Sequence, residues 1–568
     1  MRAPQGDKKH TTMEKITVYC KNTNTSKQYN IGTTAAEILA DQDIENKEDI
    51  IAALINNKCQ TLSYALFHPK DIEFIDMKNY SGRKMYIVTI CMILAKAVHD
   101  LYPKAVLHIE HPIADGYYCN ITNLGDKMIN EEMITSIKVR MQEIIARDYP
   151  VIKHEEKKEK VMEMFKGFNE NDHVMILESL NTCYAYYYEI DGYYDVYLSP
   201  LLSSTGKVPP SFDLFKYHHG MFLNIASKKD PYKQAEFYDQ PKLYEAFKRN
   251  VDLNNIIGIS NIGELNKANK EGKIFELVKI AEALHEKEIV RIADKIADNM
   301  ELKKFVMISG PSSSGKTTFS KRLSVQLLAS GIKPITISLD NYFVERDRTP
   351  RDENGDYDFE SLYALDIDFF NQQLQELLEG KEVSLPTYNF ETGKRVFKGN
   401  KVKLKDNNIV MMEGIHALNP ALTPSLNEDE KFKIYVSALT TISLTNHNWI
   451  STIDNRLIRR MVRDYKYRAN SVQDTIGRWR SVRRGEDKWI FPFQENADVM
   501  FNSALIFELA VLKTYIMPLL QEVPKDSPEY TEANRIMRLL ACIKPMSNRD
   551  LPSTSLLREF LGGSSFKY

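Results

Sequence analysis

Hydrophobic patterns divide the first part of the chain into short elements. Apolar and polar residues alternate at 16–19 and again at 72–76, which predicts two strands. Between them, the sequence predicts a short helix over 34–39. Together these elements predict a small α/β unit over residues 14–78.

Charged residues with helical spacing dominate the region 241–300. Apolar residues recur every three or four positions over 274–284 and again over 289–296, while Glu and Lys fill the other faces. This pattern predicts packed or linking helices with solvated faces. We interpret 241–300 as a helical linker.

Three apolar runs, at 305–309, 334–338 and 409–412, are typical of buried parallel strands. The first run is followed by a helical pattern at 318–330. Strands and helices that alternate in this way predict an α/β domain with a doubly wound parallel sheet. We place this domain at 301–520 and a C-terminal helical extension of it at 521–568.

The residues between the first of these strands and its helix read GPSSSGKT, from Gly310 to Thr317. The pattern G-x-x-x-x-G-K-[ST] is the phosphate-binding loop of P-loop enzymes. Its backbone N–H groups and helix N-terminus attract phosphate, its lysine reaches the outer phosphates and its last hydroxyl holds Mg²⁺. ATP and Mg²⁺ are therefore expected at this loop. The predicted ATP-binding residues are Gly310, Ser312, Ser313, Ser314, Gly315, Lys316, Thr317 and Thr318.

Acidic residues follow the other two strands. Asp340 comes shortly after the second strand, and Glu413 comes directly after the third. Because ligands bind at the carboxyl ends of strands in such a sheet, both acids are expected on the same rim as the phosphate loop. Phosphoryl transfer needs Mg²⁺ ligands and a group that orients or deprotonates the attacking hydroxyl. We therefore expect Thr317, Asp340 and Glu413 at the metal, and Lys316 and Asp340 in catalysis.

Arginines are concentrated farther along the chain. Arg456, Arg459, Arg460 and Arg463 share one face of a predicted helix, and Arg468 follows. Such a face could close over ATP and neutralise charge that develops on the transferred phosphoryl group. Two alternatives stay open, namely a solvated basic face and a surface that binds RNA.

Composition narrows the classes of partner. The 568-residue chain has a formal net charge of −2, so no overall charge attracts nucleic acid or an acidic membrane, although local patches stay open. Its six cysteines form no C-x-x-C pair, and no apolar run is long enough to span a bilayer. We expect a cytoplasmic protein with reduced thiols, no membrane partner and a disordered tail at 1–13. An oligomer is compatible with the sequence.

Longer motifs carry a specific resemblance. SLDNYF, TPRDENGDYDF, LPTYNFETGKR, MMEGIHAL and DNRLIRRMVRDYKYR occur in the order and spacing of the uridine kinase and phosphoribulokinase superfamily. The tail LPSTSLLREFLGG is similar to the end of nucleoside kinases of this type. The resemblance implies an ATP- and Mg²⁺-dependent kinase that phosphorylates the 5′-hydroxyl of a nucleoside.

The same resemblance implies roles for individual residues. Asp340 matches the base that takes the proton from the 5′-hydroxyl, and Glu413 and Thr317 match Mg²⁺ ligands. Glu360 stands where the family has an acidic contact to the ribose hydroxyls, usually an aspartate. The remaining matches are the base-pocket aromatics Tyr388 and Phe390 and the lid arginines Arg460, Arg463 and Arg468, which contact phosphates or substrate.

Three positions depart from the family pattern. Phe343 replaces a tyrosine, Gly393 replaces the histidine of the base pocket, and Asn470 replaces a lid arginine. The first two remove hydrogen-bond partners from the nucleoside side, whereas the phosphate loop and metal ligands are intact. A pocket without such a partner discriminates poorly between bases, so a strong pyrimidine preference is not expected.

The first half of the chain resembles two modules of threonyl-tRNA synthetases. NNKCQTLSYALFHPKDIEFID is similar to the end of a TGS domain, a ubiquitin-like (β-grasp) module. A helix at 86–101 and the segment AVLHIEHPIADGYYCNI resemble the α+β editing domain, here at 79–240. Its four ligand-like positions carry Val88, Met92, Tyr197 and Leu201, which are not the usual metal ligands or proton carriers. The resemblance implies an editing fold that lacks editing chemistry.

Three functional hypotheses follow. The leading one is a nucleoside kinase of uridine kinase type. A second keeps the phosphotransfer but takes a sugar phosphate or another small hydroxyl metabolite as acceptor. A third is an ATP-binding regulator that senses RNA or ribosomes through its N-terminal domains, although the intact Asp340 and Glu413 argue against it.

Overall fold

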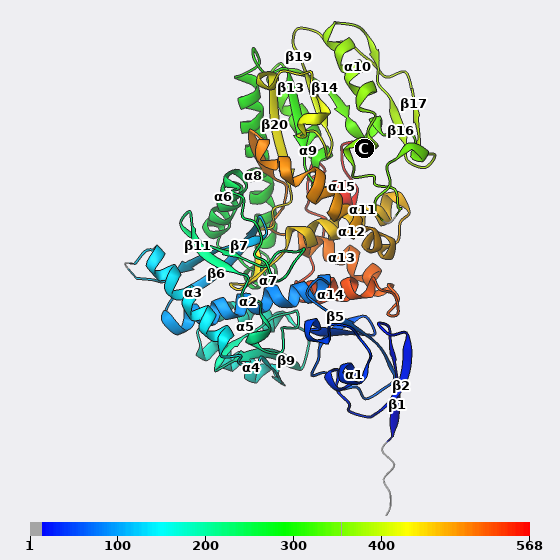
Figure 1. The fold of residues 1–568 in the computed structure, drawn as a ribbon. Coiled ribbons are helices and arrows are strands. Elements are labelled where there is room, and N and C mark those ends of the chain that lie inside the picture. Colours follow the sequence, from blue (N-terminus) through cyan, green and yellow to red (C-terminus); the bar gives the residue numbers. More distant parts are fainter. Residues whose placement is uncertain (1–13, 126, 354, 568) are drawn as a thin grey trace, which may run out of the picture. The chain divides into compact units, whose positions relative to one another are not determined.

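The computed structural model of the chain describes residues 14–125, 127–353 and 355–567, so the tail predicted at 1–13 lies outside the described residues. The chain forms two compact units (Figure 1). The first unit holds the residues up to 177 together with 181–237 and 523–539. The second unit holds 178–180, 238–522 and 540–568.

A mixed five-stranded sheet with the order β2-β1-β5-β3-β4 opens the first unit. Its strands are β1 (Lys15–Cys20), β2 (Thr25–Asn30), β3 (Ala52–Ile55), β4 (Lys58–Thr61) and β5 (Lys70–Ile75). Alternate residues of β1 are buried, as its sequence predicts, and β1 pairs in parallel with β5. The helix α1 (Ala35–Asp41) contributes Ile38 to the core of this sheet. Thr34 begins that helix with a capping box closed by Glu37.

Two further sheets and several helices complete the first unit. The four-stranded sheet β11-β12-β7-β6 is antiparallel, and so is the three-stranded sheet β10-β9-β8. The helix expected at 86–101 begins earlier, because Asn79 caps its first turn. The bounds are α2 (Tyr80–Leu101), β6 (Val106–Ile113), β7 (Gly116–Thr122), α3 (Glu131–Ala146), β8 (Ile152–Lys157), α4 (Lys158–Gly167), α5 (Asn171–Ser179), β9 (Tyr184–Ile190), β10 (Tyr193–Asp195), β11 (Asp213–Tyr217) and β12 (Gly220–Asn224).

The second unit is built on a five-stranded parallel sheet with the order β14-β19-β13-β20-β23. Its strands are β13 (Phe305–Ser309), β14 (Lys333–Ser338), β19 (Asn408–Glu413), β20 (Lys431–Ser437) and β23 (Val499–Asn502). All residues of β13 are buried, as its continuous apolar run predicts. The chain leaves β13 toward β14 on one side and later returns to β20 on the other. Such a reversal of strand order creates the crevice in which α/β sheets bind ligands.

Helices surround this sheet, and α9 (Lys316–Ala329) packs on β13, β14 and β19. The segment expected to be a linker belongs to the same compact unit as the sheet. It forms α6 (Pro241–Ile257), α7 (Ile262–Lys270) and the single helix α8 (Ile274–Ala297). Arg322 of α9 joins α8 by an ion pair of 2.6 Å to Glu286.

The second unit contains further helices and short strands. They are η3 (Leu339–Tyr342), η4 (Arg346–Arg348), η5 (Leu362–Ala364), α10 (Ile367–Leu378), β15 (Val383–Ser384), β16 (Thr387–Asn389), β17 (Lys394–Val396), β18 (Lys401–Val402), η6 (Pro420–Leu422), η7 (Glu428–Glu430), β21 (Ser443–Thr445), β22 (Asn448–Trp449), α11 (Thr452–Arg468), α12 (Val472–Trp489), η8 (Phe491–Asn496), α13 (Glu508–Gln521) and α15 (Arg558–Leu561). The helix α14 (Tyr530–Ala541) lies mostly in the first unit. The C-terminal extension expected at 521–568 is therefore divided between the two units.

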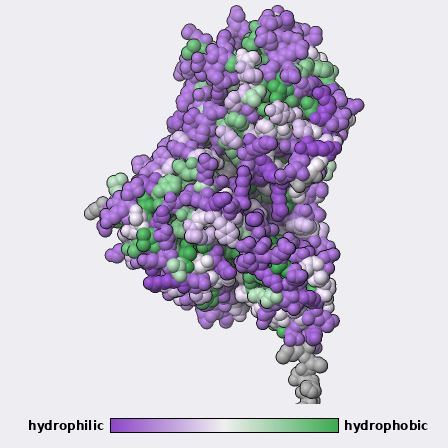
Figure 2. Space-filling view, in the orientation of Figure 1, coloured by the Kyte–Doolittle hydropathy of each residue, from purple (hydrophilic) through white to green (hydrophobic). Residues whose placement is uncertain are grey.

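The exposed surface is largely hydrophilic. In the view of Figure 2, apolar residues occur in small scattered groups among polar ones. Among the described residues, no helix is both long enough and apolar enough to cross a membrane.

Candidate active site

The GPSSSGKT segment connects β13 to α9 as a tight loop. Gly315 precedes the helix with a φ of +85°, a left-handed conformation that glycine adopts without strain. A Cβ atom on Gly310 would lie 1.9 Å from the Val436 carbonyl oxygen, so no larger residue fits there. Within the described part of the chain, the buried hydroxyls of Ser313 and Ser314 have no hydrogen-bond partner. These hydroxyls and the first N–H groups of α9 provide donors for an anion.

Lys316 and Thr317 point to the end of the sheet where the acids were expected. The buried Lys316 Nζ donates a hydrogen bond to the Pro311 carbonyl at 3.1 Å. The Thr317 hydroxyl lies 3.4 Å from Glu413 Oε1. A hydroxyl and a carboxylate are the oxygen ligands that Mg²⁺ prefers, so these two residues fit a magnesium site.

The rim position of both acids follows from strand register. Ser338 of β14 is paired with Glu413 of β19, and Asp340 follows on the exposed side of η3. The pKa of Glu413 is raised to about 7, chiefly by burial; Lys316 opposes the shift, and the carboxylates of Asp340 and Glu559 add to it. A cation in this place would relieve that repulsion.

Glu360 lies close enough to Arg460, Lys316 and Asp340 for their charges to affect its pKa. Its side chain packs closely against Gly485 of α12, where an added Cβ would come within 2.2 Å of the Glu360 Cβ. Burial raises the pKa of Glu360 to about 7, although Arg460 opposes the shift. Its Oε2 atom is enclosed without a hydrogen-bond partner among the described residues. A carboxyl group with an unused oxygen suits a hydroxyl ligand, as the resemblance implies for this position.

Sequence reasoning did not identify His416, which lies three residues beyond Glu413. Its side chain is 1% exposed, and over the described ranges neither ring nitrogen has a hydrogen-bond partner. Burial lowers its pKa to about 4, and the backbone of Ser361 and Glu360 lies beside it. A neutral imidazole therefore lies next to the backbone of Glu360 and Ser361. The only signal in the sequence is a histidine within an otherwise apolar segment.

The two expected base-pocket aromatics come together beside the Asp340 turn. Tyr388 lies 5.1 Å from Phe390 and 5.6 Å from Phe343, measured between ring centroids. Asn341, next to Asp340, accepts a hydrogen bond from the Tyr388 backbone N–H at 3.1 Å. Tyr388 is buried, whereas Phe390 is 55% exposed, so one ring has a free face for a planar ligand.

Gly393 lies in the turn between β16 and β17 with a φ of +68°. A Cβ at this position would lie 2.7 Å from the Arg346 Cβ. The Arg346 N–H donates to the Gly393 carbonyl at 3.1 Å, and the Arg346 guanidinium contacts the Phe390 carbonyl. Arg346 thus occupies the space that a side chain at position 393 would need. Sequence reasoning did not identify Arg346 as a residue of this site.

Two arginines of the predicted basic helix face, Arg456 and Arg459, are buried and support the phosphate loop. Arg456 is paired with Glu486, and Arg459 is paired with Glu508 at 2.5 Å, all four side chains being buried. Arg456 also donates to the Ser312 carbonyl at 3.1 Å. The expectation that these two arginines close over ATP, and the alternative of a solvated face, are both wrong for them. Their partners come from later helices, which helical spacing cannot reveal.

The three predicted lid arginines, Arg460, Arg463 and Arg468, lie together around the Asp464 carboxylate. Arg460 donates to the Ser312 hydroxyl at 2.7 Å, so it reaches the phosphate loop directly. Arg463 and Arg468 gather with Arg460 around the buried carboxylate of Asp464, at 2.9 Å and 3.6 Å respectively. Repulsion from Arg463, together with burial, lowers the pKa of Arg468 to about 10. Three cations around one carboxylate leave a net positive charge for a phosphate.

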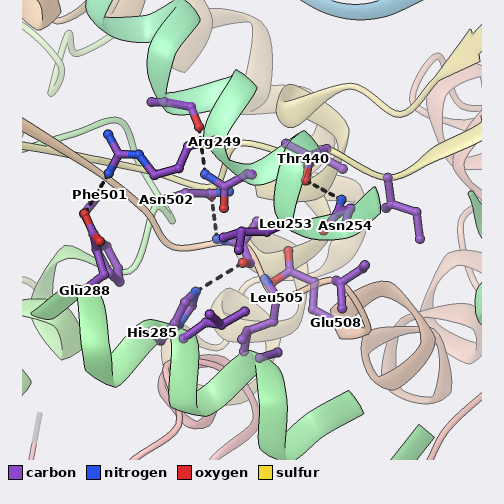
Figure 3. A pocket seen from close by; sticks show the side chains of 18 of the residues that line it. Arg249, Leu253, Asn254, His285, Glu288, Thr440, Phe501, Asn502, Leu505 and Glu508 are labelled. Atoms are coloured by element: carbon purple, nitrogen blue, oxygen red, sulfur yellow. Dashed lines mark hydrogen bonds and ion pairs between the residues drawn. The ribbon is translucent and has the colours of Figure 1, made fainter. Parts of the chain in front are cut away.

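A separate cavity of about 230 Å³ lies between α6, α8 and α13 (Figure 3). Arg249 and Glu288 form an ion pair of 2.8 Å at this cavity, and His285 reaches the Ala504 carbonyl at 3.2 Å. Burial lowers the pKa of His285 to about 3. None of the predicted site residues lines the cavity, so it is not the phosphate site.

In the first unit, the four editing-type positions lie on or near α2. Met92, Tyr197 and Leu201 are buried, and Val88 is half-buried. The Thr89 hydroxyl of α2 accepts a hydrogen bond from the Leu202 N–H at 2.9 Å, which joins the two segments that carry these positions.

Comparison with known proteins gives matches to the second unit. The sequence pattern of the Phosphoribulokinase / Uridine kinase family matches residues 305–507. A uridine kinase of Ureaplasma urealyticum is 26% identical over 195 residues, which cover 34% of this chain and 85% of that protein. A uridine kinase of Staphylococcus aureus is 28% identical over 202 residues, which cover 35% and 88%.

A solved structure is also similar to part of the chain. The structure of a possible uridine kinase from Bacillus stearothermophilus is 22% identical, with 38% of this chain and all of that chain covered at a TM-score of 0.26, which is too low to support an argument. The family motifs and the rim geometry agree in residues and place. Residues 305–507 therefore form a P-loop kinase domain of the phosphoribulokinase/uridine kinase family, an ATP-dependent phosphotransferase that acts on a hydroxyl group.

Proposed function

We propose that this chain transfers phosphate from ATP to the 5′-hydroxyl of a nucleoside. One observation carries the proposal: the carboxylates of Asp340 and Glu413 follow adjacent parallel strands beside the phosphate loop. Tyr388 and Phe390 lie next to this rim, because the Tyr388 backbone N–H donates a hydrogen bond to the Asn341 side chain. A base stacked there would bring its sugar toward Asp340.

Each residue then has a distinct task. Lys316 and the loop N–H groups bind the phosphates, and Thr317 and Glu413 hold the magnesium ion, which neutralises phosphate charge when bound. Asp340, which is exposed at the rim, accepts the proton of the attacking hydroxyl. The arginines at 460, 463 and 468 stabilise charge on the transferred group.

Glu360 and the aromatic pair would set acceptor choice. The enclosed Oε2 of Glu360 suits a ribose hydroxyl. Arg346 stands where a histidine at 393 would lie, and its guanidinium is already engaged by the Phe390 carbonyl. We therefore propose weak selectivity among bases, since a stacked base would be read by few hydrogen bonds.

The test is an ATP-consumption screen of the full-length protein. Uridine, cytidine, adenosine, guanosine, inosine and a panel of sugar phosphates are offered at equal concentration, with Lys316→Ala as the inactive control. We expect turnover with several nucleosides and little with sugar phosphates. Turnover with sugar phosphates alone would overturn the nucleoside assignment, and a hundredfold or greater preference for uridine and cytidine would overturn the weak selectivity.

For the first unit we propose a TGS-like β-grasp module at 14–78 and a synthetase-like module at 79–240. The parallel β1–β5 pair with antiparallel neighbours and one covering helix supports the first assignment. The antiparallel sheets beside α2 and α3 support the second. Since the editing-type positions are apolar or phenolic, docking or oligomerisation is the function left for this part.

A further inference from the structure

The last helix of the chain places a carboxylate at the phosphate loop. Glu559 Oε2 accepts a hydrogen bond from the Thr318 hydroxyl at 2.6 Å and another from the Thr318 backbone N–H at 3.2 Å. Thr318 lies in the first turn of α9, where the N–H groups have no partner within the helix. This carboxylate therefore uses a donor of the type that binds the α- and β-phosphates in a loop of this class.

The segment that carries Glu559 is firmly packed. Leu556, Leu557 and Phe560 are fully buried, and the Leu556 side chain fills the space in front of Gly315. Arg558 donates to the Leu551 carbonyl at 2.6 Å, and Lys466 of α11 contacts the Leu561 carbonyl. The backbone of α15 is thus fixed beside the loop, and the half-exposed Glu559 side chain is held there by its two hydrogen bonds to Thr318.

A nucleotide and this carboxylate cannot use the same donors together. Both the nucleotide phosphate and Glu559 are negatively charged. The site also contains the carboxyl group of Glu413, whose pKa is raised in part by Glu559. A phosphate that enters must break two hydrogen bonds to Thr318 and move a like charge away.

We propose that Glu559 is an internal competitor for the nucleotide phosphate and that it determines how tightly the loop binds ATP and ADP. The acceptor plays no part in this competition. The inference therefore rests on nucleotide binding at the loop and not on the identity of the acceptor.

The experiment compares full-length wild type with Glu559→Ala, Glu559→Gln and the matched control Asp550→Asn, which removes an exposed carboxylate from the same C-terminal segment. Dissociation constants for Mg²⁺-free ADP and for inorganic tripolyphosphate are measured by calorimetry. We expect Glu559→Ala to bind both about tenfold more tightly, the change expected when a charge-assisted hydrogen bond no longer has to be broken. Glu559→Gln should lie between Glu559→Ala and wild type, and Asp550→Asn should match wild type.

Steady-state kinetics give an independent readout. In Glu559→Ala the KM for ATP should fall with little change in kcat, because the competition precedes the chemical step. Unchanged or weaker ADP binding in Glu559→Ala would overturn the proposal. So would a loss confined to Mg²⁺-ATP, since Glu559 would then be a metal ligand. Absence of ADP binding in wild type would overturn nucleotide binding at the loop itself, whereas failure of the acceptor screen alone would leave this result standing.

Discussion

At the scale of single residues, the site contains two carboxyl groups whose burial disfavours the ionised form. Glu413 and Glu360 are both raised to a pKa of about 7, chiefly by burial. Ionisation of such groups destabilises the folded protein. A bound cation or hydroxyl ligand offsets that destabilisation, so the same groups favour ligand binding. The same physical feature therefore predicts effects on both stability and activity.

Glu413→Gln should stabilise the nucleotide-free protein and abolish turnover. Because the folded-state pKa is raised, the contribution of Glu413 to stability is present at low pH and is lost as the pH rises through about 7. The variant should therefore gain roughly 1–3 kcal/mol at pH 8 and much less at pH 5. Thermal unfolding at both pH values checks this, and an equal gain at both would show that ionisation of Glu413 is not the cause.

Asp340→Asn should reduce kcat far more than it weakens ATP binding. The amide keeps the shape of the side chain but cannot accept the hydroxyl proton, a loss of about 10²–10⁴ in rate. Kinetics with a saturating nucleoside and calorimetry with ATP separate the two effects. If ATP affinity collapsed while bound substrate still turned over, Asp340 would be a binding residue.

At the scale of elements, α11 and α12 act as a frame for the phosphate loop. The buried Glu486 of α12 accepts from Arg456 at 2.8 Å, from Arg483 at 2.8 Å and from the Ser312 N–H at 3.1 Å. One carboxylate thus holds two helices and the loop in register. The hairpin β16–β17 carries Tyr388 and, in its turn, Phe390. Arg346 holds that turn by packing against Gly393 and by a hydrogen bond to its carbonyl.

Glu486→Gln should be strongly destabilising, by about 3–5 kcal/mol, because it leaves the buried Arg456 guanidinium without a charged partner. The exposed neighbour Asp487, which contacts Arg483 at 3.3 Å, provides the control Asp487→Asn with an expected change of at most about 1 kcal/mol. Urea unfolding followed by a fluorescent probe of the second unit measures both. Similar changes in the two variants would contradict the role of Glu486.

Gly393→His should not restore a pyrimidine-reading pocket. The left-handed φ and the 2.7 Å approach to the Arg346 Cβ strain any side chain at 393, so we expect a loss of roughly 1–3 kcal/mol in stability. Gly393→Ala, which adds only the Cβ, should show most of the same loss. A fully stable Gly393→His variant with increased uridine turnover would show that the hairpin adapts and that base contact is what the glycine removed.

At the scale of the whole molecule, a P-loop kinase domain and a second compact unit belong to one chain. Within the first unit, Glu170, Asp172 and His173 form a cluster that could be considered for a metal. However, both ring nitrogens of His173 face carboxylates, Asp172 at 3.1 Å and Asp195 at 2.6 Å. Although burial by itself lowers the pKa of His173, these carboxylates hold it well above its ordinary value, which favours an imidazolium ion rather than a ligand.

We therefore predict that the purified protein holds no stoichiometric zinc and does not hydrolyse mischarged tRNA. The editing-type positions Val88, Met92, Tyr197 and Leu201 offer no imidazole or thiolate. Elemental analysis and a deacylation assay on Ser-tRNA check the two parts separately. One zinc per chain that His173→Asn removes would contradict the ion-pair interpretation.

The sequence alone determined the features that depend on neighbours along the chain. The strand, the GPSSSGKT loop and the helix of 305–329 were predictable, because hydrophobic runs, glycine conformations and helix starts are local. The rim position of Asp340 and Glu413 was predictable too, since all parallel strands end on the same edge.

Only the tertiary structure decided which distant groups meet. Arg456 pairs with Glu486, 30 residues away in the sequence, and Thr318 donates a hydrogen bond to Glu559, 241 residues away. Arg346 fills the space beside Gly393. Spacing along a helix shows which arginines share a face, but it does not show whether that face meets solvent, a phosphate or a buried carboxylate. Such pairings depend on packing between elements far apart in the sequence, where burial makes an unpaired charge too costly to keep.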